Sequence, residues 1–209
     1  MNRKIVLVGG DPNSINSEII YKCWKKLPNK IKKRIILISN YKLLKDQFKK
    51  LNYNIKLSNE QNLFKLNKSN ELKILNIKLD YKDPFKVPLK SAKPFVLKSL
   101  DLAHKLALNK KIAGIINCPI NKNLLGNKKI GVTEYLANKC LVKKNSEVMI
   151  IRNKELMISP ITTHLDIRSI SNKINKKLII TKINVINSWF KKTFKRQPVI
   201  AVLGLNPHL

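Results

Sequence analysis

The chain has 209 residues, 44% of them hydrophobic, which is enough for one large folded domain or for one domain and part of another. It contains no run of the roughly 18 apolar residues that a membrane helix needs. The apolar run Ile5–Val8 is also too short for a signal-peptide core, so we expect a cytoplasmic protein. The three cysteines, Cys23, Cys118 and Cys140, are widely spaced and favour neither a disulfide framework nor a zinc knuckle.

The chain is strongly basic, because 43 lysines and arginines outnumber 12 acidic residues and give a formal net charge of +31. Such a charge attracts polyanions. The lysines are spread along the whole chain, however, arginines are few, and asparagine and isoleucine are also abundant. Lys, Asn and Ile share A/T-rich codons, so genome composition accounts for all three excesses together. We expect attraction of phosphorylated substrates and weak nonspecific RNA binding, and we do not expect specific nucleic-acid binding.

Strands and helices alternate through the first half of the chain. Apolar runs predict strands, and apolar residues at helical spacing predict helices, with Ser14 or Asn16 as the candidate N-cap of the first helix. The predicted elements are a strand at Ile5–Val8, a helix at Ser17–Leu27, a strand at Arg34–Ser39 and a helix at Tyr41–Leu51. Residues 52–70 are polar and weakly patterned, and a strand is predicted at Leu72–Leu79.

The second half continues the same alternation after a proline-containing loop at Asp80–Pro88. The predicted elements are a helix at Ser91–Leu108 with Pro94 in its first turn, a strand at Ile112–Asn117, a hairpin at Val148–Arg152 and Glu155–Ser159 closed by Asn153-Lys154, a helix at Ile174–Phe194 and a buried strand at Val199–Leu205. This order predicts an α/β fold with a mostly parallel sheet, helices on both of its faces and an antiparallel hairpin.

Glycines and polar residues follow several predicted strands, where open α/β sheets bind ligands. Residues 9–14 (Gly-Gly-Asp-Pro-Asn-Ser) could be a phosphate loop, but they match no glycine-rich fingerprint, and an ordinary turn is favoured. Lys122 could hold a phosphate or carboxylate, although a solvated lysine is the stronger reading in so basic a chain. Thr133 is a candidate N-cap for a helix from Glu134, and its hydroxyl could instead contact a substrate.

Two of the three histidines also follow predicted strands. His164 closes Thr162-Thr163-His164, and His208 closes Asn206-Pro207-His208. Two neutral imidazoles could bind one divalent metal, but a catalytic site usually needs a third protein ligand, which Asp166 could supply. His104 lies within a predicted helix and receives no role.

At these same residues the chain resembles a known family. The matching segments are Gly9–Pro12, Ser91-Ala92, Cys118–Lys122, Gly131 with Thr133–Ala137, Thr162–Leu165 and Gly204–His208. Together, in this order, they are similar to the 4-hydroxythreonine-4-phosphate dehydrogenases, NAD(P)-dependent enzymes of pyridoxal phosphate biosynthesis. The resemblance spans nearly the whole chain but only about the first two-thirds of a family member.

The resemblance implies a reaction. The 3-hydroxyl of 4-phosphooxy-L-threonine is oxidised, with NAD or NADP as hydride acceptor, to 2-amino-3-oxo-4-phosphooxybutanoate. This β-keto acid then loses carbon dioxide and becomes 3-amino-2-oxopropyl phosphate. A divalent metal (Zn, Mg, Mn or Co) is held by three histidines in the family, and two of them fall on His164 and His208. Thr133 matches a substrate-binding threonine, and Val132 occupies a position that is often histidine. No catalytic or cofactor-binding residue is assigned.

The resemblance also implies a fold like that of isocitrate and isopropylmalate dehydrogenases and a homodimer with its active site between subunits. Residues 1–130 would form a first α/β domain without its C-terminal part. Residues 131–209 would begin a second α/β region that binds metal and substrate and carries the subunit contacts.

The chain departs from the family pattern in three places. The first loop, usually Ala-Gly-Ile-Gly-Pro-Glu, reads Asn-Ser-Ile-Asn-Ser-Glu at residues 13–18, Val132 replaces a histidine, and the chain ends at Leu209. Because the third metal histidine lies further along in the family, we expect a C-terminally truncated portion that is inactive by itself. Two alternatives stay open: a related metal-dependent dehydrogenase for another hydroxy acid, and a basic, non-enzymatic module that binds RNA or other polyanions.

Overall fold

A computed structural model describes residues 3–60, 70–126, 131–140, 147–163 and 165–204 of the chain. The chain divides into two compact units, a first unit at Met1–Leu136 and a second unit at Ala137–Leu209. We describe each unit by itself. Within the described residues, none of the helices combines the length and the apolar character that crossing a membrane requires. The predicted roles of residues 131–209 in metal, substrate and subunit contacts remain predictions.

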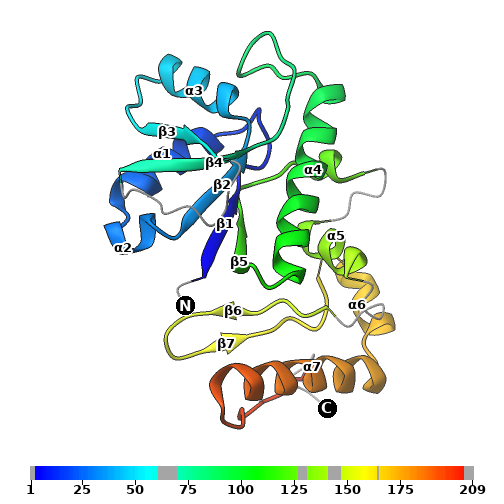
Figure 1. Ribbon diagram of the computed structural model, residues 1–209. Helices are drawn as coiled ribbons and strands as arrows, with labels where there is room; N and C mark the ends of the chain where they lie inside the picture. The colour runs from blue at the N-terminus through cyan, green and yellow to red at the C-terminus, as the bar shows by residue number, and fades with distance from the viewer. Residues whose placement is uncertain (1–2, 61–69, 127–130, 141–146, 164, 205–209) are drawn as a thin grey trace. The chain divides into compact units, whose positions relative to one another are not determined.

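The first unit is built on a five-stranded parallel sheet (Figure 1). Its strands lie in the order β3-β4-β2-β1-β5, and every neighbouring pair is parallel. The bounds are β1 Lys4–Val8, β2 Ile35–Ser39, β3 Lys56–Asn59, β4 Glu71–Asn76 and β5 Ile112–Asn117. The predicted α/β class with a mostly parallel sheet is confirmed.

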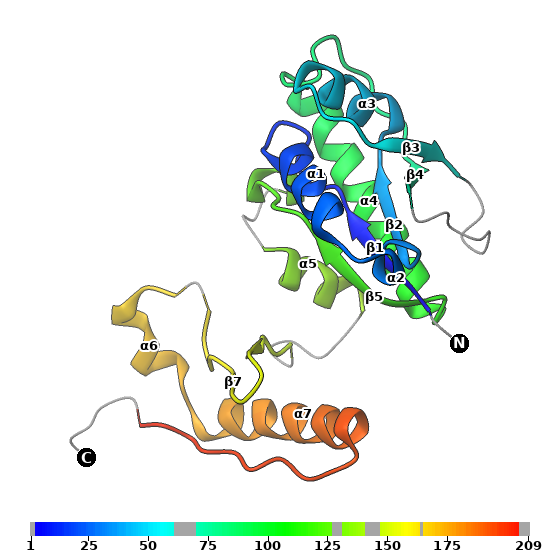
Figure 2. The ribbon, with the colours of Figure 1, turned by 90° about the vertical axis from the view of Figure 1, so that its left-hand side faces the viewer.

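Helices cover both faces of this sheet (Figure 1 and Figure 2). Alternate residues of a strand point to opposite faces, and the two central strands are apolar on both. Val6, Val8, Ile36 and Ile38 pack with α4, while Leu37 and Leu7 pack with residues of α1 and α3. The helices of the first unit are α1 Asn16–Lys26, α2 Asn29–Lys32, α3 Tyr41–Lys50, α4 Leu89–Leu108 and the 3₁₀ helix η1 Lys122–Leu125, and α5 Val132–Lys139 begins in this unit and ends just beyond it.

Three local predictions in the first unit need correction. The N-cap of α1 is Ile15, whose side chain has no oxygen to accept a hydrogen bond from the helix. Neither predicted residue caps the helix, because Asn16 lies inside it and the Ser14 hydroxyl donates to the Asp11 carbonyl. Helix α4 begins at Leu89, so Pro94 lies in its second turn rather than its first. The weakly patterned stretch contains β3, an edge strand that pairs with β4.

The second unit contains a two-stranded hairpin and two helices. Its elements are β6 Ile151–Arg152, β7 Met157–Ile158, α6 Ile167–Lys173 and α7 Lys176–Phe194. The hairpin is antiparallel as predicted, with Ile151 opposite Ile158. Its turn is longer than the predicted pair of residues, because the Asn153 side chain accepts hydrogen bonds from the main-chain N–H groups of Glu155 and Leu156. Helix α6 is an element that the apolar pattern did not predict.

The predicted buried strand at Val199–Leu205 is wrong for the residues that the structure describes. Residues 199–204 form neither a helix nor a strand. Val199 is 103% exposed and Leu203 is 88% exposed. A strand needs a neighbour for its main-chain N–H and C=O groups, and residues 199–204 have no strand partner within the described part of the second unit.

Candidate functional site at the carboxyl edge of the sheet

The direction in which strands are added to the parallel sheet reverses between β1 and β5. From β1 the chain adds β2, β4 and β3 on one side, and it then adds β5 on the other side. In open α/β sheets, such a switch point leaves a crevice beyond the carboxyl ends of the strands, and ligands bind there. The two loops at this point are residues 9–15 after β1 and residues 118–121 after β5, and both contain segments singled out in the sequence.

The loop after β1 is held in a fixed shape by its own polar groups. Gly10 has a φ of +74°, which favours glycine. The Asp11 carboxylate accepts a hydrogen bond from the Asn13 N–H at 2.9 Å, and the Asp11 carbonyl accepts one from the Ser14 N–H at 3.3 Å. Neither Ser14 nor Asn16 has a positive φ. The two glycines of the usual family loop are therefore not needed for this backbone shape.

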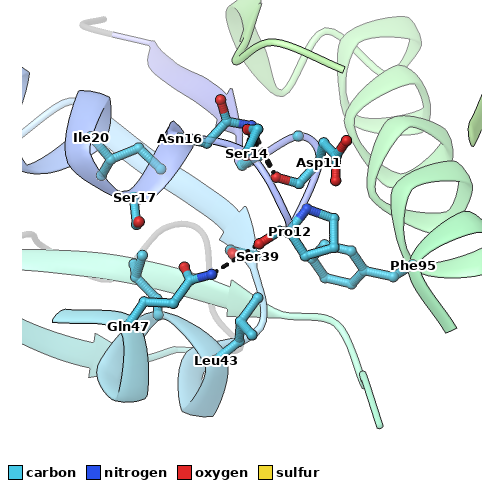
Figure 3. A pocket seen from close by; sticks show the side chains of 13 residues that line it. Asp11, Pro12, Ser14, Asn16, Ser17, Ile20, Ser39, Leu43, Gln47 and Phe95 are labelled. Atoms are coloured by element: carbon cyan, nitrogen blue, oxygen red, sulfur yellow. Dashed lines mark hydrogen bonds between the residues drawn. The ribbon is translucent and has the colours of Figure 1, made fainter. Parts of the chain in front are cut away.

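A small cavity lies beside this loop (Figure 3). Its polar lining comes from the loop and from β2, α1 and α3, and Figure 3 shows the Gln47 amide directed at the Pro12 carbonyl. The polar lining residues are Asp11, Ser14, Asn16, Ser17, Ser39 and Gln47. Its volume of about 10 Å³ is room for one water molecule. The cavity itself therefore has no room for a phosphate group, and the reading of residues 9–14 as an ordinary turn stays a prediction.

The loop after β5 begins with a buried thiol. Cys118 is 5% exposed, and its N–H donates to the Val8 carbonyl at 2.9 Å, which extends the pairing of β1 with β5. Burial, with a smaller contribution from Cys23, raises the pKa of the Cys118 thiol to about 11. A protonated, buried thiol is a poor nucleophile. Lys122, at the start of η1, is exposed to solvent, as expected of a solvated lysine.

Helix α5 carries the two predicted substrate-binding positions. The Gly131 carbonyl accepts the first helical hydrogen bond, from the Tyr135 N–H, so Gly131 is the N-cap and the prediction of Thr133 as N-cap is wrong. Val132 is partly buried and packs against the core cluster around α4. Thr133 is exposed, and its hydroxyl forms no hydrogen bond with any residue that the structure describes.

A tyrosine fixes α5 against α4. The Tyr135 hydroxyl donates to Asp101 Oδ1 at 2.7 Å. Burial and this carboxylate together raise the pKa of Tyr135 well above its usual value. The hydroxyl therefore stays protonated and keeps its bond to the carboxylate, and the helix that bears Val132 and Thr133 is held in place.

The predicted metal ligands His164 and His208 lie outside the described residues. Asp166, the third candidate, is the N-cap of α6, where its Oδ1 accepts from the Arg168 N–H at 2.9 Å. This capping role explains Asp166 without a metal. The described ranges contain no group of three His, Cys, Asp or Glu side chains that could hold a metal ion, so the metal site remains a prediction.

Three side-chain amides hold the loop after β1 through contacts that the sequence reasoning did not predict. Asn13 exchanges two hydrogen bonds with the main chain of Val87, at 2.9 Å and 2.7 Å. The Gln47 amide donates to the carbonyls of Pro12 and Pro84, and the Asn16 amide donates to three carbonyls, one of them that of Pro119. Local periodicity contains no signal for such long-range bonds.

Comparison with known proteins supports the resemblance over almost the whole chain. The family model described as "Pyridoxal phosphate biosynthetic protein PdxA" matches residues 31–209. The 4-hydroxythreonine-4-phosphate dehydrogenase of Sulfurihydrogenibium sp. is 32% identical over 209 residues, which cover 98% of this chain and 63% of the relative. The Aquifex aeolicus protein of the same name is 31% identical over 216 residues, covering 100% of this chain and 64% of the relative.

A solved structure agrees on the fold. The crystal structure of 4-hydroxythreonine-4-phosphate dehydrogenase from Klebsiella pneumoniae superposes with a TM-score of 0.84 at 24% identity, covering 99% of this chain and 65% of that one. The chain thus spans less than two-thirds of the length of these relatives. Because the family model covers most of the sequence, this chain belongs to the PdxA family of pyridoxal phosphate biosynthetic proteins.

Proposed function

We propose that this protein takes part in the NAD(P)-dependent oxidation of 4-phosphooxy-L-threonine. The substrate alcohol would lose a hydride to NAD⁺ or NADP⁺ and a proton to solvent, giving 2-amino-3-oxo-4-phosphooxybutanoate. Loss of carbon dioxide from this β-keto acid would then yield 3-amino-2-oxopropyl phosphate. The observation that carries the proposal is the family match over residues 31–209. We also propose that the reaction takes place in the cytoplasm.

Two features of the chain support a phosphorylated substrate. Thr133 presents a hydroxyl in the first turn of α5, and the Tyr135–Asp101 hydrogen bond holds that helix in place. The net charge of +31 would also attract a substrate that carries a phosphate and a carboxylate, most strongly at low salt. Val132 would bound the same site with an apolar side chain in place of a titratable one.

The proposed cofactors are NAD or NADP and a divalent metal. His164 and His208 would bind the metal through neutral imidazole nitrogens, a donor set that suits divalent transition metals. The bound metal would supply the positive charge that lowers the pKa of the substrate hydroxyl. The only other histidine of the 209 residues is His104, in the middle of α4, so a three-histidine site needs a ligand from outside these residues.

We further propose that the protein is a homodimer. The only buried side chain in the described part of the second unit is that of Lys182. Large apolar side chains are exposed there instead, among them Ile151, Ile158, Ile167 and Trp189. Apolar surface of this kind is normally covered by another protein surface. Sedimentation of the product of the complete reading frame should give a mass near twice that of its single chain, and a monomer at all concentrations would contradict the homodimer.

The activity is tested with the product of the complete reading frame. Incubated with 4-phosphooxy-L-threonine, NAD⁺ or NADP⁺ and a divalent metal, it should form NADH or NADPH, seen by absorbance. His164→Ala should abolish this activity and weaken metal binding, whereas His104→Ala should retain both. Absence of reduced cofactor from the folded, metal-loaded gene product would overturn the proposal.

The same assay separates the two alternatives. Turnover of another hydroxy acid, with none of 4-phosphooxy-L-threonine, would identify a related dehydrogenase. Sequence-selective RNA binding that resists salt would identify a nucleic-acid module, because contacts to phosphates alone weaken steeply as salt rises.

A further inference from the structure

The loops after β1 and β5 are joined by one buried side chain, that of Asn16. Its Nδ2 lies 2.9 Å from the Gly9 carbonyl oxygen, 3.2 Å from that of Asp11 and 2.8 Å from that of Pro119. Asn16 is only 3% exposed. Buried carbonyl groups need hydrogen-bond donors. This single amide donates to three carbonyls, two of them in the buried residues Gly9 and Asp11 and the third in the exposed residue Pro119.

The backbone at Gly10 is shaped to admit this side chain. A Cβ atom at position 10 would lie 2.6 Å from Asn16 Nδ2 and 2.6 Å from the Pro119 oxygen, closer than real contacts allow. The Asp11 N–H also donates to the Pro119 carbonyl, at 3.2 Å. The Pro119 carbonyl thus receives one hydrogen bond from the first loop and one from Asn16 at the start of α1, and the absence of a side chain at Gly10 lets the two loops approach.

Pro119 is the point through which the first loop contacts the segment after β5. Directly before it, Cys118 packs in the core cluster that also contains Ile20 and Trp24 of α1. Shortly after it, η1 buries Leu124 and Leu125 against the other face of the sheet. A change in the bonds to the Pro119 carbonyl would therefore loosen the cover over the Cys118 thiol before it disturbs the sheet.

We infer that Asn16 is a positioning residue that sets the spacing of the two loops at the switch point of the sheet and closes the crevice between them. The usual family loop has glycine at this position, which has no side chain and so no side-chain amide to donate. In this chain the side chain of Asn16 makes the connection between the loops. The inference concerns the placement of the loops and does not depend on which substrate the protein takes.

The test follows the rate at which a small alkylating reagent labels Cys118, resolved from Cys23 and Cys140 by peptide mass spectrometry. In Asn16→Ala the rate should rise on the order of tenfold, since losing the shared amide favours local opening by about 1.4 kcal/mol. Asn16→Asp keeps the shape but turns a carboxylate toward three carbonyl oxygens, so it should label faster still.

Asn40 supplies a matched control. It is also a buried asparagine at a strand end, and its Nδ2 donates to the Ile77 carbonyl at 2.8 Å while its Oδ1 accepts from the Leu43 N–H. It ties the loop after β2, not the loop after β5. Asn40→Ala should lower the free energy of unfolding through the lost cap of α3 and leave the labelling rate of Cys118 unchanged at matched overall stability.

Two results would overturn the inference. One is labelling of Cys118 in Asn16→Ala at the wild-type rate, and the other is equal acceleration in Asn40→Ala at the same overall stability. If neither Asn16 variant folds, hydrogen exchange of the wild-type chain decides. The Asp11 amide, which donates to Pro119, should then be protected about as well as the Cys118 amide, and an unprotected Asp11 amide would contradict the role of Asn16. None of these readouts involves dehydrogenase activity, so they can fail or succeed separately from the proposed function.

Discussion

Replacing Gly10 with alanine should destabilise the first unit far more than the same change at Gly114. Gly10 has a φ of +74°, which costs an L-residue about 1 to 2 kcal/mol. The new Cβ would also meet the Pro119 carbonyl oxygen at 2.6 Å, and that atom is main chain that cannot rotate away. Moving it would strain hydrogen bonds worth about 1 kcal/mol each. We therefore expect Gly10→Ala to lower the free energy of unfolding by about 2 to 4 kcal/mol.

Gly114, in β5, is the control because nothing lies within 4 Å of a Cβ placed there, and its φ is not positive. Alanine at this position should be neutral or should stabilise by up to about 1 kcal/mol, because glycine is the more flexible residue in the unfolded chain. Urea denaturation followed by circular dichroism measures both variants. If the two alanine variants unfold within about 0.5 kcal/mol of each other, the close approach of the loops at Gly10 is refuted.

Three further predictions concern the core, the thiol and α5. Leu100→Ala, at a fully buried position of α4, should lower the free energy of unfolding by about 2 to 5 kcal/mol. Leu108, on the same helix, is 60% exposed, so Leu108→Ala should lower it by less than about 1 kcal/mol. Equal losses in the two variants would contradict the packing of α4. Burial raises the pKa of the Cys118 thiol from 9.0 to about 11, so the protonated thiol contributes stability that is fully present below pH 9 and is lost as the pH rises through 11. Between pH 8 and pH 10, the free energy of unfolding of wild type should therefore fall by about 1 kcal/mol more than that of Cys118→Ala. Parallel curves of unfolding free energy against pH for the two proteins would exclude this. Tyr135→Phe should cost about 1 kcal/mol through the lost bond to Asp101, and an unchanged urea midpoint would show that α5 is held by other contacts.

The elements that could be predicted from the sequence are those whose own residues determine them. β5 was predicted with the bounds that the structure has, since Ile112–Asn117 is an apolar run between polar residues. β3 was missed because Lys56–Asn59 contains one apolar residue, Leu57. The edge of β4 forms that strand through parallel pairing and a 2.8 Å salt bridge between Lys56 and Glu71, and such a neighbour is invisible in a local pattern.

The candidate site was predictable in the same uneven way. Strand-end position singled out the loop after β1, because parallel strands bring their carboxyl ends to one edge of the sheet, and the role of that loop in ligand binding stays a prediction. The hydrogen bond from Asn16 to the Pro119 carbonyl could not be predicted, because the two residues lie 103 positions apart. An asparagine at the start of a helix is also typical of an N-cap. The predicted strand at Val199–Leu205 rested on apolar residues alone, and apolar residues make a strand only when a neighbour supplies hydrogen bonds.

The most direct measurement of the proposed reaction is product identification. The product of the complete reading frame is incubated with 4-phosphooxy-L-threonine, a divalent metal and NAD⁺ or NADP⁺, and the mixture is examined by mass spectrometry. We predict 3-amino-2-oxopropyl phosphate and one equivalent each of carbon dioxide and reduced cofactor, with far less turnover in Thr133→Ala. Recovery of unchanged substrate from folded, metal-loaded protein, while an authentic dehydrogenase of the family converts it under the same conditions, would contradict the proposed function.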